Sequence, residues 1–194
     1  MTAEVSQLIT VEAAGQVAES PFYIPMTGPA TRLRRSLKHD DTFIVLDSHG
    51  DIGASAGGPD GLFNADTRYL ARLEMVLDDV QPLLLGSNLR DDNSALTVDL
   101  TNSDVYRHDR LVLQKDTLHI IRSIFLWRGT AYQRIALQNH GDRLASFDLT
   151  LLFDNDFADL FEVRGERRLR RGIGASRLLG PSDVVLEYSG LDGK

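Results

Sequence analysis

From Thr42 onward the sequence consists of short runs rich in Val, Ile, Leu, Phe and Thr, each bounded by Gly, Asp, Asn or His. Such runs between turn-forming residues are typical of β-strands. No helical pattern of a dozen residues lies between them, although parallel strands would need a crossover of that length. The pattern therefore predicts an all-β fold with antiparallel strands and argues against a βαβ arrangement.

The strands predicted on this basis are Thr42–Asp47, Tyr69–Leu77, Pro82–Leu89, Ala95–Leu100, Thr117–Trp127, Ala131–Gln138, Phe147–Phe153 and Val184–Tyr188. In Leu70–Leu77 alternate side chains face opposite ways, so one face of this strand is predicted to be buried. Tight turns at Arg128-Gly129 and at Asn139–Asp142 are expected to join antiparallel neighbours. The expected architecture is a β-sandwich whose strands are connected mostly as meanders.

Residues 1–36 show no strand alternation and are predicted to form an irregular N-terminal arm or leader. The segment Ser20–Pro29 contains three prolines, whose fixed φ favours extended structure. The segment Val11–Glu19 is compatible with a helical turn or two, although Gly15 weakens it. The sequence therefore places the folded domain after this arm, at residues 37–194.

The composition excludes several classes of function. A net charge of −7 opposes binding to nucleic acid, whose phosphates attract basic surfaces. The apolar runs are far shorter than the ~20 residues needed to cross a bilayer, so no membrane association is expected. The sequence has no cysteine, and its start lacks the pattern of a secretory signal, so we predict a cytoplasmic protein.

Two stretches, Gly61–Leu70 and Phe153–Gly165, combine aromatics, acids and an arginine in an order that a generic β-domain does not require. Between them lies a third, Asp91–Asp104. The three together resemble the N-terminal domain of bacterial and archaeal glycogen debranching enzymes of the amylo-α-1,6-glucosidase type. The resemblance runs from about Leu37 to the end of the sequence, and it implies a supersandwich-like antiparallel β-sandwich.

The resemblance also implies where chemistry takes place. In that family the acids that cleave the glycosidic bond lie in a later domain, a toroid of paired helices. The implied partner is therefore a C-terminal catalytic domain of the same polypeptide, which makes the parent protein a glycoside hydrolase and the isolated chain inactive. The family would carry more strands, so we expect the sandwich to be cut short at its C-terminal end, with an exposed face that favours homo-oligomers.

The first and last motifs supply the candidate site residues. Asp66 and Arg68 are well placed to fix a loop by charge-assisted hydrogen bonds, with Phe63 packing beneath them, and an arginine can hold a carboxylate with two bonds. An alternative role for this loop is contact with sugar or with the catalytic domain. The interface or core-anchoring candidates in the last motif are Asp156, Asp159, Glu162 and Arg164.

Other interpretations of the last motif are weaker. Four acids within Asp154–Glu162 offer oxygen ligands for calcium, but core residues such as Phe157 and Phe161 interrupt the alternate spacing that a calcium loop needs. A glycosidase needs a pair of carboxyl groups, whereas acids in turns normally stay solvated. We therefore predict no catalytic residue, no metal and no cofactor, and expect a short helical turn over Asn155–Phe161.

The remaining polar motifs favour structural roles. The glycine-rich segment Gly50–Gly61 lacks the Lys-Ser or Lys-Thr of a phosphate cradle and is predicted to be a flexible loop. His49 and His140 each precede Gly-Asp, which predicts turns with a glycine at positive φ rather than a metal site. The basic stretch Arg164–Arg171 is expected to be a solvated hairpin or a surface that pairs with acids rather than a phosphate track, and a neighbouring domain is one source of such acids.

Sugar recognition typically uses aromatic rings, and the candidates are Trp127 and Tyr132, with Tyr106 and Tyr69. Trp127 ends a predicted strand beside a turn, where it is equally suited to closing the edge of a hydrophobic core. We favour the core position for Trp127 because large aromatics are buried on average.

The leading hypothesis is a noncatalytic β-sandwich domain that packs on a helical-toroid domain in α-glucan metabolism. The alternative is a free-standing carbohydrate-binding module. A third hypothesis is a complete small hydrolase that uses acids such as Asp156 and Glu162.

Overall fold

The computed structural model describes residues 33–53 and 58–191. Within them the strands are β1 (Arg35–His39), β2 (Thr42–Leu46), β3 (Gly61–Asn64), β4 (Thr67–Leu70), β5 (Arg72–Leu77), β6 (Leu83–Leu89), β7 (Ala95–Thr101), β8 (Val105–Arg107), β9 (Arg110–Leu113), β10 (Leu118–Trp127), β11 (Thr130–Asn139), β12 (Leu149–Asp154), β13 (Ile173–Leu178) and β14 (Val184–Ser189). The helix α1 (Leu160–Val163) is short.

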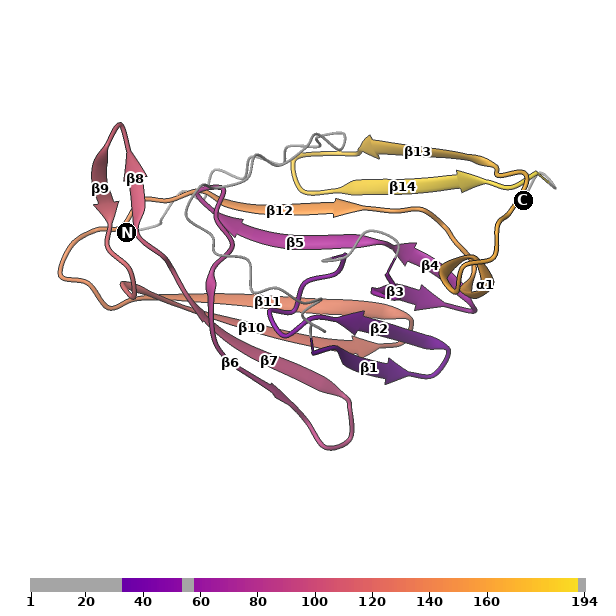
Figure 1. Ribbon diagram of the computed structural model, residues 1–194, viewed down its shortest axis with the longest axis horizontal. Coiled ribbons are helices and arrows are strands. Elements are labelled where there is room, and N and C mark those ends of the chain that lie inside the picture. Colours follow the sequence, from indigo (N-terminus) through magenta and orange to yellow (C-terminus); the bar gives the residue numbers. More distant parts are fainter. Residues whose placement is uncertain (1–32, 54–57, 192–194) are drawn as a thin grey trace.

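The strands form two facing layers (Figure 1). One layer is the sheet β11-β10-β7-β6, and the other contains the pair β12-β5. The meander β1-β2-β3-β4 lies at one end, where β1 contacts β7 and β10. The hairpins β8-β9 and β13-β14 are separate sheets. Every pairing between these strands is antiparallel, and most join consecutive strands, which confirms the predicted all-β sandwich.

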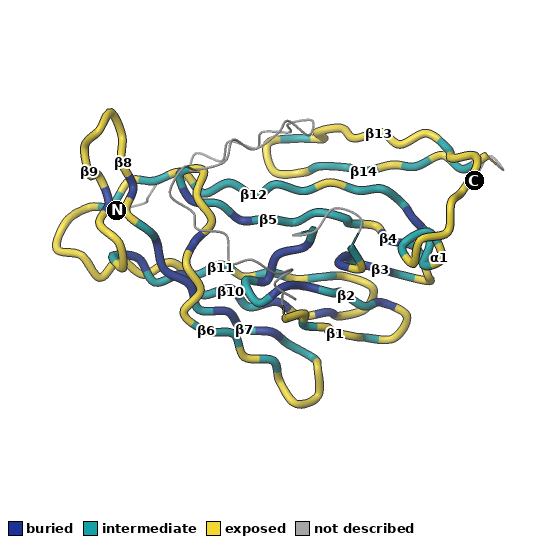
Figure 2. The backbone as a smooth tube through the Cα atoms, in the orientation of Figure 1, coloured by how far each residue is buried: buried dark blue, intermediate teal, exposed yellow. Residues whose placement is uncertain are grey.

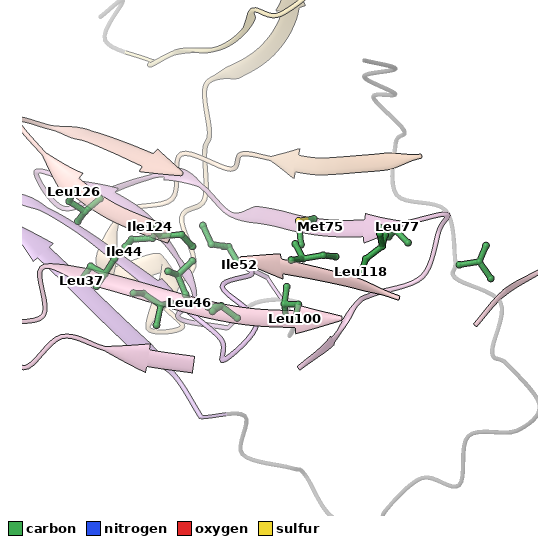
Figure 3. Packing of buried hydrophobic residues seen from close by; sticks show 14 of the residues in the cluster. Leu37, Ile44, Leu46, Ile52, Met75, Leu77, Leu100, Leu118, Ile124 and Leu126 are labelled. Carbon is green, nitrogen blue, oxygen red and sulfur yellow. The ribbon is translucent and has the colours of Figure 1, made fainter. Parts of the chain in front are cut away.

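The core lies between the layers and is built from aliphatic side chains (Figure 3). On β10, Leu118, Ile120, Ile124 and Leu126 are buried, and the residues between them are more exposed, apart from one inward arginine. The same cluster includes Met75 and Leu77 of β5, Leu37 of β1, Ile44 and Leu46 of β2, and Leu96, Val98 and Leu100 of β7. Figure 2 shows the buried segments along these inner strands, whereas β13 is exposed throughout.

The inward arginine is Arg122, whose side chain is 0% exposed. Its Nη1 donates to Asp51 Oδ1 at 2.5 Å and to the His49 carbonyl at 2.8 Å. Its Nη2 donates to the Gly50 carbonyl, also at 2.8 Å. A single guanidinium on the middle of β10 thus holds the segment that follows β2, because it satisfies both a charge and two backbone carbonyls there.

Asp51 carries the other charge of this pair and is 2% exposed. Its carboxylate also accepts bonds from the Met75 N–H at 3.2 Å and from Gln81 Nε2 at 2.9 Å, which connects it to the β5 layer. Asp47 Oδ1 accepts the Asp51 N–H at 3.0 Å and fixes the turn. Burial raises the pKa of Asp51, and the positive charge of Arg122 opposes that rise.

The prediction of a flexible loop over Gly50–Gly61 is wrong at both ends of the segment, because Asp60 is buried and Gly61 begins β3 at one end and Gly50 and Ile52 are packed at the other. Ile52 is 0% exposed and exchanges backbone hydrogen bonds of 2.8 and 3.1 Å with Leu73. Gly50 has a φ of +79°, and a Cβ there would lie 3.0 Å from Ile124 Cδ1, so glycine is required for close packing. The sequence reasoning missed this because the buried partner, Arg122, lies on a distant strand.

Two predicted connections are also wrong. The strand expected over Tyr69–Leu77 is interrupted at Ala71, so that β4 joins the meander and β5 pairs with β12. The turn at Asn139–Asp142 was expected to join neighbours, but β11 pairs with β10 and β12 pairs with β5. The chain therefore crosses from one layer to the other at this turn. The predicted burial of one face of β5 is confirmed at Met75 and Leu77.

The structure contains elements that sequence patterns did not indicate. These are β1, β3, β8, β9 and β13. The β1 strand begins at Arg35, so Arg35 and Ser36 of the expected arm belong to a sheet. The expected helical turn over Asn155–Phe161 is displaced, because α1 begins at Leu160. The segments Val11–Glu19 and Ser20–Pro29 lie outside the described residues.

We expect Arg122→Ala to lower the free energy of unfolding by about 3–5 kcal/mol, because it leaves the Asp51 carboxylate buried without a partner charge. The double variant Arg122→Met/Asp51→Leu should recover part of this loss. The measurement is urea unfolding followed by circular dichroism. Arg177→Ala is the control, since it breaks an exposed pair with Glu187 and should change stability little. Equal effects of both single variants would contradict the structural role of the buried pair.

The pKa of Asp51 also sets a pH dependence. Burial places the folded-state pKa of Asp51 above its ordinary value of about 3.9. At pH values between these two pKa values, the folded chain therefore binds the Asp51 proton more tightly than the unfolded chain does. The contribution of Asp51 protonation to stability is fully present below about pH 3.9 and is lost as pH rises through the folded pKa. Urea unfolding from about pH 4 to about pH 7 should show wild type losing stability relative to Asp51→Asn. Parallel profiles would contradict this expectation.

Candidate functional site

The first and last motifs of the sequence meet in space through one ion pair. Arg68 lies on β4 and is 7% exposed, and its Nε donates to Asp156 Oδ1 at 3.0 Å. Its Nη2 donates to the second oxygen, Asp156 Oδ2. This is the two-bond grip on a carboxylate that the sequence suggested for Arg68. The bond connects residues 88 positions apart, so it fixes the turn after β12 against the meander.

The same guanidinium also organises the chain before β3. Arg68 Nη1 donates to the carbonyls of Gly58 and Asp60 at 2.9 and 3.1 Å. The guanidinium carbon lies 6.0 Å from the centre of the Phe63 ring, on which it forms a cation–π contact. A Cβ on Gly61 would lie 2.5 Å from Arg68 Cδ and 2.9 Å from the Phe63 ring. The glycine that opens the motif therefore leaves room for the arginine.

Backbone bonds reinforce this junction. The Arg68 N–H donates to the Ala158 carbonyl at 2.8 Å, and the Leu160 N–H donates to the Asp66 carbonyl at 3.0 Å. Asp66 itself is exposed at a turn with a φ of 66°. Asp66 therefore stabilises the junction through its turn conformation and its backbone carbonyl. The charged side chain of this motif that forms the ion pair is Arg68.

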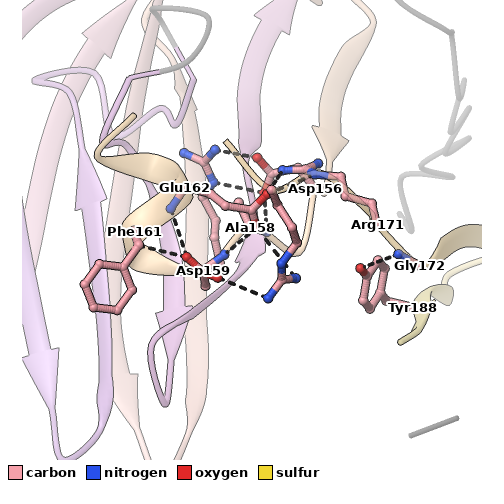
Figure 4. Close-up of polar contacts among 10 residues, drawn as sticks. Asp156, Ala158, Asp159, Phe161, Glu162, Arg171, Gly172 and Tyr188 are labelled. Carbon is pink, nitrogen blue, oxygen red and sulfur yellow. Dashed lines mark hydrogen bonds and ion pairs between the residues drawn. The ribbon is translucent and has the colours of Figure 1, made fainter. Parts of the chain in front are cut away.

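Helix α1 continues the junction with a capping box (Figure 4). The Asp159 side chain accepts the backbone N–H groups of Phe161 and Glu162 at 2.9 Å, and Glu162 Oε2 accepts the Asp159 N–H at 3.2 Å. This reciprocal capping satisfies donors that one turn of helix cannot satisfy itself. Arg164 forms the C-cap, and its side chain is exposed. Phe161, expected in the core, is 61% exposed.

The basic stretch that follows pairs with these same acids. Arg171 donates to Glu162 Oε1 through Nε at 3.0 Å and Nη2 at 2.8 Å, and Arg168 Nη2 donates to Asp159 Oδ2 at 3.1 Å. The hydrogen bond to Glu162 raises the pKa of Arg171. The prediction that this stretch pairs with acids is confirmed for Arg168 and Arg171. The acids come from the preceding motif, and no neighbouring domain is needed to supply them.

An aromatic run anchors the β13-β14 hairpin to the junction. The Phe157 ring stacks on Tyr188 of β14, with centroids 5.3 Å apart, and meets Tyr69 of β4 edge to face at 5.6 Å. The Tyr188 hydroxyl accepts the Gly172 N–H at 2.7 Å. Phe157 has a φ of 45°, an unusual value for a bulky residue. Rings on both sides hold it in this conformation.

The middle motif, Asp91–Asp104, closes the turns around β7. Asp92 Oδ1 accepts the backbone N–H and the hydroxyl of Ser94 at 3.0 and 2.6 Å, in a turn where Asn93 has a φ of 53°. At the other end, Asn102 is 1% exposed, and its side chain bonds Leu118 N–H and the Gln114 carbonyl at 2.7 Å. The motif therefore sets where β7 begins and ends.

Asp156, Asp159 and Glu162 of the last motif are arranged as ion-pair partners of arginines rather than as a facing pair of carboxyl groups. Three further acids, Asp47, Asp51 and Glu74, line a pocket of about 210 Å³ together with Gly53, Met75, Val76 and Gln81. This volume is below the ~300–1,000 Å³ of typical ligand pockets. Asp51 already accepts bonds from Arg122, Met75 and Gln81. Among the described residues no group of acids and histidines has a geometry that holds a metal ion.

The histidine turns and the aromatic residues differ from expectation. Gly50 has the positive φ expected after His49, but Gly141 has no positive φ, and its N–H donates to Asn139 Oδ1 at 2.8 Å instead. The core position favoured for Trp127 is wrong, because this side chain is 51% exposed. It lies on the outward-facing side of β10, where alternation with buried Leu126 places it in solvent.

The fold and its central junction define an antiparallel β-sandwich domain organised by two buried arginines. A family model described as the N-terminal domain of some glycogen debranching enzymes matches residues 37–194. The chain belongs to this family. A search of curated proteins and a search of solved structures each found no match. In the part of the chain that the structure describes, no helix is long and apolar enough to span a membrane.

We expect Arg68→Ala to lower the free energy of unfolding by about 2–3 kcal/mol, because it removes charge-assisted bonds to Asp156 and leaves carbonyls unpaired. Arg68→Lys should recover little, since an ammonium group cannot reproduce the forked geometry. Chemical unfolding is the measurement, with Arg168→Ala as the exposed control. Full stability of Arg68→Lys would show that charge alone matters.

We expect Gly61→Ala to be destabilising by about 1–3 kcal/mol, because the added methyl displaces the Arg68 stem and the Phe63 ring. Gly86→Ala is a matched control in a strand, since a Cβ there meets nothing within 4 Å. Thermal unfolding of the two variants tests this difference. A smaller effect at Gly61 than at Gly86 would contradict the close packing at the motif.

Proposed function

We propose that this chain is a noncatalytic β-sandwich domain of a glycogen debranching enzyme of the amylo-α-1,6-glucosidase type, and that it works in the cytoplasm. Hydrolysis of the α-1,6 linkage would take place in a helical-toroid domain of the same polypeptide. The observation that supports this proposal is the use of the motif acids. Asp156, Asp159 and Glu162 each accept bonds from arginine side chains, so their oxygens serve as anchors.

A glycosidase makes a different demand on its carboxyl groups. One must donate a proton and another must act as base or nucleophile, about 5–9.5 Å apart across the sugar. Both must therefore present oxygens to a ligand. Glu162 instead directs Oε1 to Arg171 and Oε2 to the Asp159 backbone, with a side chain only 8% exposed. This arrangement favours the scaffold over the hypothesis of a small complete hydrolase.

The β13-β14 hairpin is the surface we assign to contact with the catalytic domain. Ile173, Leu178 and Leu179 are 78%, 56% and 58% exposed, and the neighbouring Leu169 is 98% exposed. These exposed aliphatic side chains lie along one hairpin and the chain on either side of its first strand, and exposed apolar side chains are what interaction surfaces use. Exposed arginines of the Arg164–Arg171 stretch border them, which suits a partner surface with acidic residues at its rim. In the isolated chain the same surface favours self-association.

The isolated chain should release no glucose from a branched α-glucan limit dextrin, because its motif carboxylates are committed to arginines. Glucose is measured by a coupled enzymatic assay, with a debranching enzyme as the positive control. Release that is abolished in Asp156→Ala/Glu162→Ala would contradict the noncatalytic function and support the small hydrolase.

Docking of the hairpin is tested by hydrogen exchange in the longer polypeptide and in the isolated chain. We expect the amides of Ile173–Leu178 to exchange more slowly in the longer protein, since the partner domain would cover them. The amides of Val105–Arg107 serve as the internal reference. Equal exchange of the hairpin in both proteins would contradict this assignment of the docking surface.

A further inference from the structure

The edge strand β6 leaves part of the inner face of its sheet uncovered. Its paired neighbour is β7. Leu84 is directly opposite Leu100, which is 1% exposed in the core, so both side chains belong to the inner face. Leu89 belongs to the same face and packs against the core. Leu84 is nevertheless 37% exposed, and Leu85, which a β-bulge leaves without a partner on β7, is 60% exposed.

The strand β1 covers only the second half of β6. Arg35 is the first residue of β1, and its Nη2 donates to the Ser87 hydroxyl at 3.4 Å. The Lys38 N–H donates to the Asn93 carbonyl, also at 3.4 Å. The direction of β1 is therefore from the middle of β6 toward the turn that follows it. The two exposed leucines precede Ser87, on the side from which the chain enters β1.

An apolar edge of this kind calls for a cover. The sequence of β6, LLLGSNL, contains no charged residue, although charges on edge strands are what discourages contact with other chains. The bulge interrupts the regular row of backbone groups, which disfavours the addition of another strand. The two leucines therefore need apolar side chains packed on them rather than a strand partner.

The sequence before β1 contains a segment with suitable side chains. Residues 21–26 are PFYIPM, and no charged residue lies between Glu19 and Arg32. The two prolines of this apolar segment have a fixed φ, which lowers the entropy lost when the segment is held in one conformation. Its aromatic and aliphatic side chains are chemically suited to exposed leucines, because contact removes apolar surface of both from water.

Position in the chain favours this segment over a separate partner. Leu33 is the first described residue, and β1 begins at Arg35, so the preceding chain starts beside the uncovered half of β6. The link between residue 26 and Leu33 contains Gly28-Pro29, a dipeptide typical of turns. A segment on so short a link has an effective concentration of about millimolar. It therefore occupies the leucines ahead of a separate protein of similar affinity.

We propose that the apolar segment 21–26 packs on Leu84 and Leu85 and completes the inner face of the sheet β11-β10-β7-β6. The N-terminal arm is then part of the core at this edge. The proposal rests on the arrangement of β1 and β6 and does not depend on the enzyme class assigned above. The competing occupants are a second copy of the chain and another surface for the segment.

The absence of cysteine allows a nitroxide label at a single chosen position. We expect a label at Ser20→Cys in the 194-residue chain to broaden the amide signals of Leu84 and Leu85, and reduction of the nitroxide to restore them. Phe22→Ser/Ile24→Ser in the same labelled chain should abolish this broadening, because it removes the apolar contact. The matched control is Leu8→Ser/Ile9→Ser, which makes the same kind of change elsewhere in the arm and should leave the broadening unchanged.

Two variants of β6 test which face the segment covers. Leu84→Ser should reduce the broadening at Leu85, whereas Leu83→Ser should leave it unchanged. Leu83 is a matched control because it is 38% exposed and adjacent in sequence. It is opposite Thr101, which follows the inward Leu100 and so belongs to the outer face. Circular dichroism and thermal unfolding verify that each variant is folded.

Three results would overturn the proposal. The first is broadening that persists in Phe22→Ser/Ile24→Ser or that Leu83→Ser and Leu84→Ser reduce equally. The second is broadening passed from a spin-labelled chain to a separate isotopically labelled chain in a mixed sample, which would make a second copy the occupant. The third is broadening centred on Phe125 and Tyr132, whose exposed rings stack 4.9 Å apart on the outer face of β10 and β11. None of these results changes the glucose-release assay, which tests the noncatalytic function separately.

Discussion

The pair between Arg68 and Asp156 is the interaction on which the family motifs depend. It connects the meander to the segment between β12 and β13, and several other features exist to accommodate it. Gly61 lacks the Cβ that would displace the Arg68 side chain. The carbonyls of Gly58 and Asp60 accept bonds from Arg68 Nη1, and the guanidinium lies over the Phe63 ring. Residues that appear in the sequence as an unexplained series of aromatics and acids are thus the parts of one junction.

Arg122 performs a similar task inside the sandwich, and the comparison explains why both positions require arginine. A buried ion pair often stabilises a fold no more than an apolar pair of the same volume, because both charges must leave water. Each of these guanidiniums, however, also bonds two backbone carbonyls of an irregular segment. An apolar replacement would leave those carbonyls buried without partners. The arginines therefore determine the course of irregular segments, because they donate hydrogen bonds to the carbonyls of His49, Gly50, Gly58 and Asp60.

The sequence predicted the features that depend on local periodicity. Alternation located the long strands, such as Leu118–Trp127, and the Arg128-Gly129 turn is a hairpin in which both residues have positive φ. Prediction from the sequence failed for elements whose structure depends on a partner far away in the chain. The strand expected over Tyr69–Leu77 divides because its two halves pair with different sheets. The segment after β2 is ordered because Arg122 reaches it from β10, a contact that no local pattern contains.

The site shows the same division between local and distant causes. The resemblance identified the right motifs, and the capping residues at Asp159 and Glu162 have recognisable spacing. The partner of Arg68 was not predictable from one sequence, since many acids were equally eligible. Trp127 was misplaced because average burial outweighed strand parity, although parity with Leu126 already placed it on the outer face. Parity is the stronger argument wherever a strand has one buried face, since a residue cannot change faces without shifting the register of the entire strand.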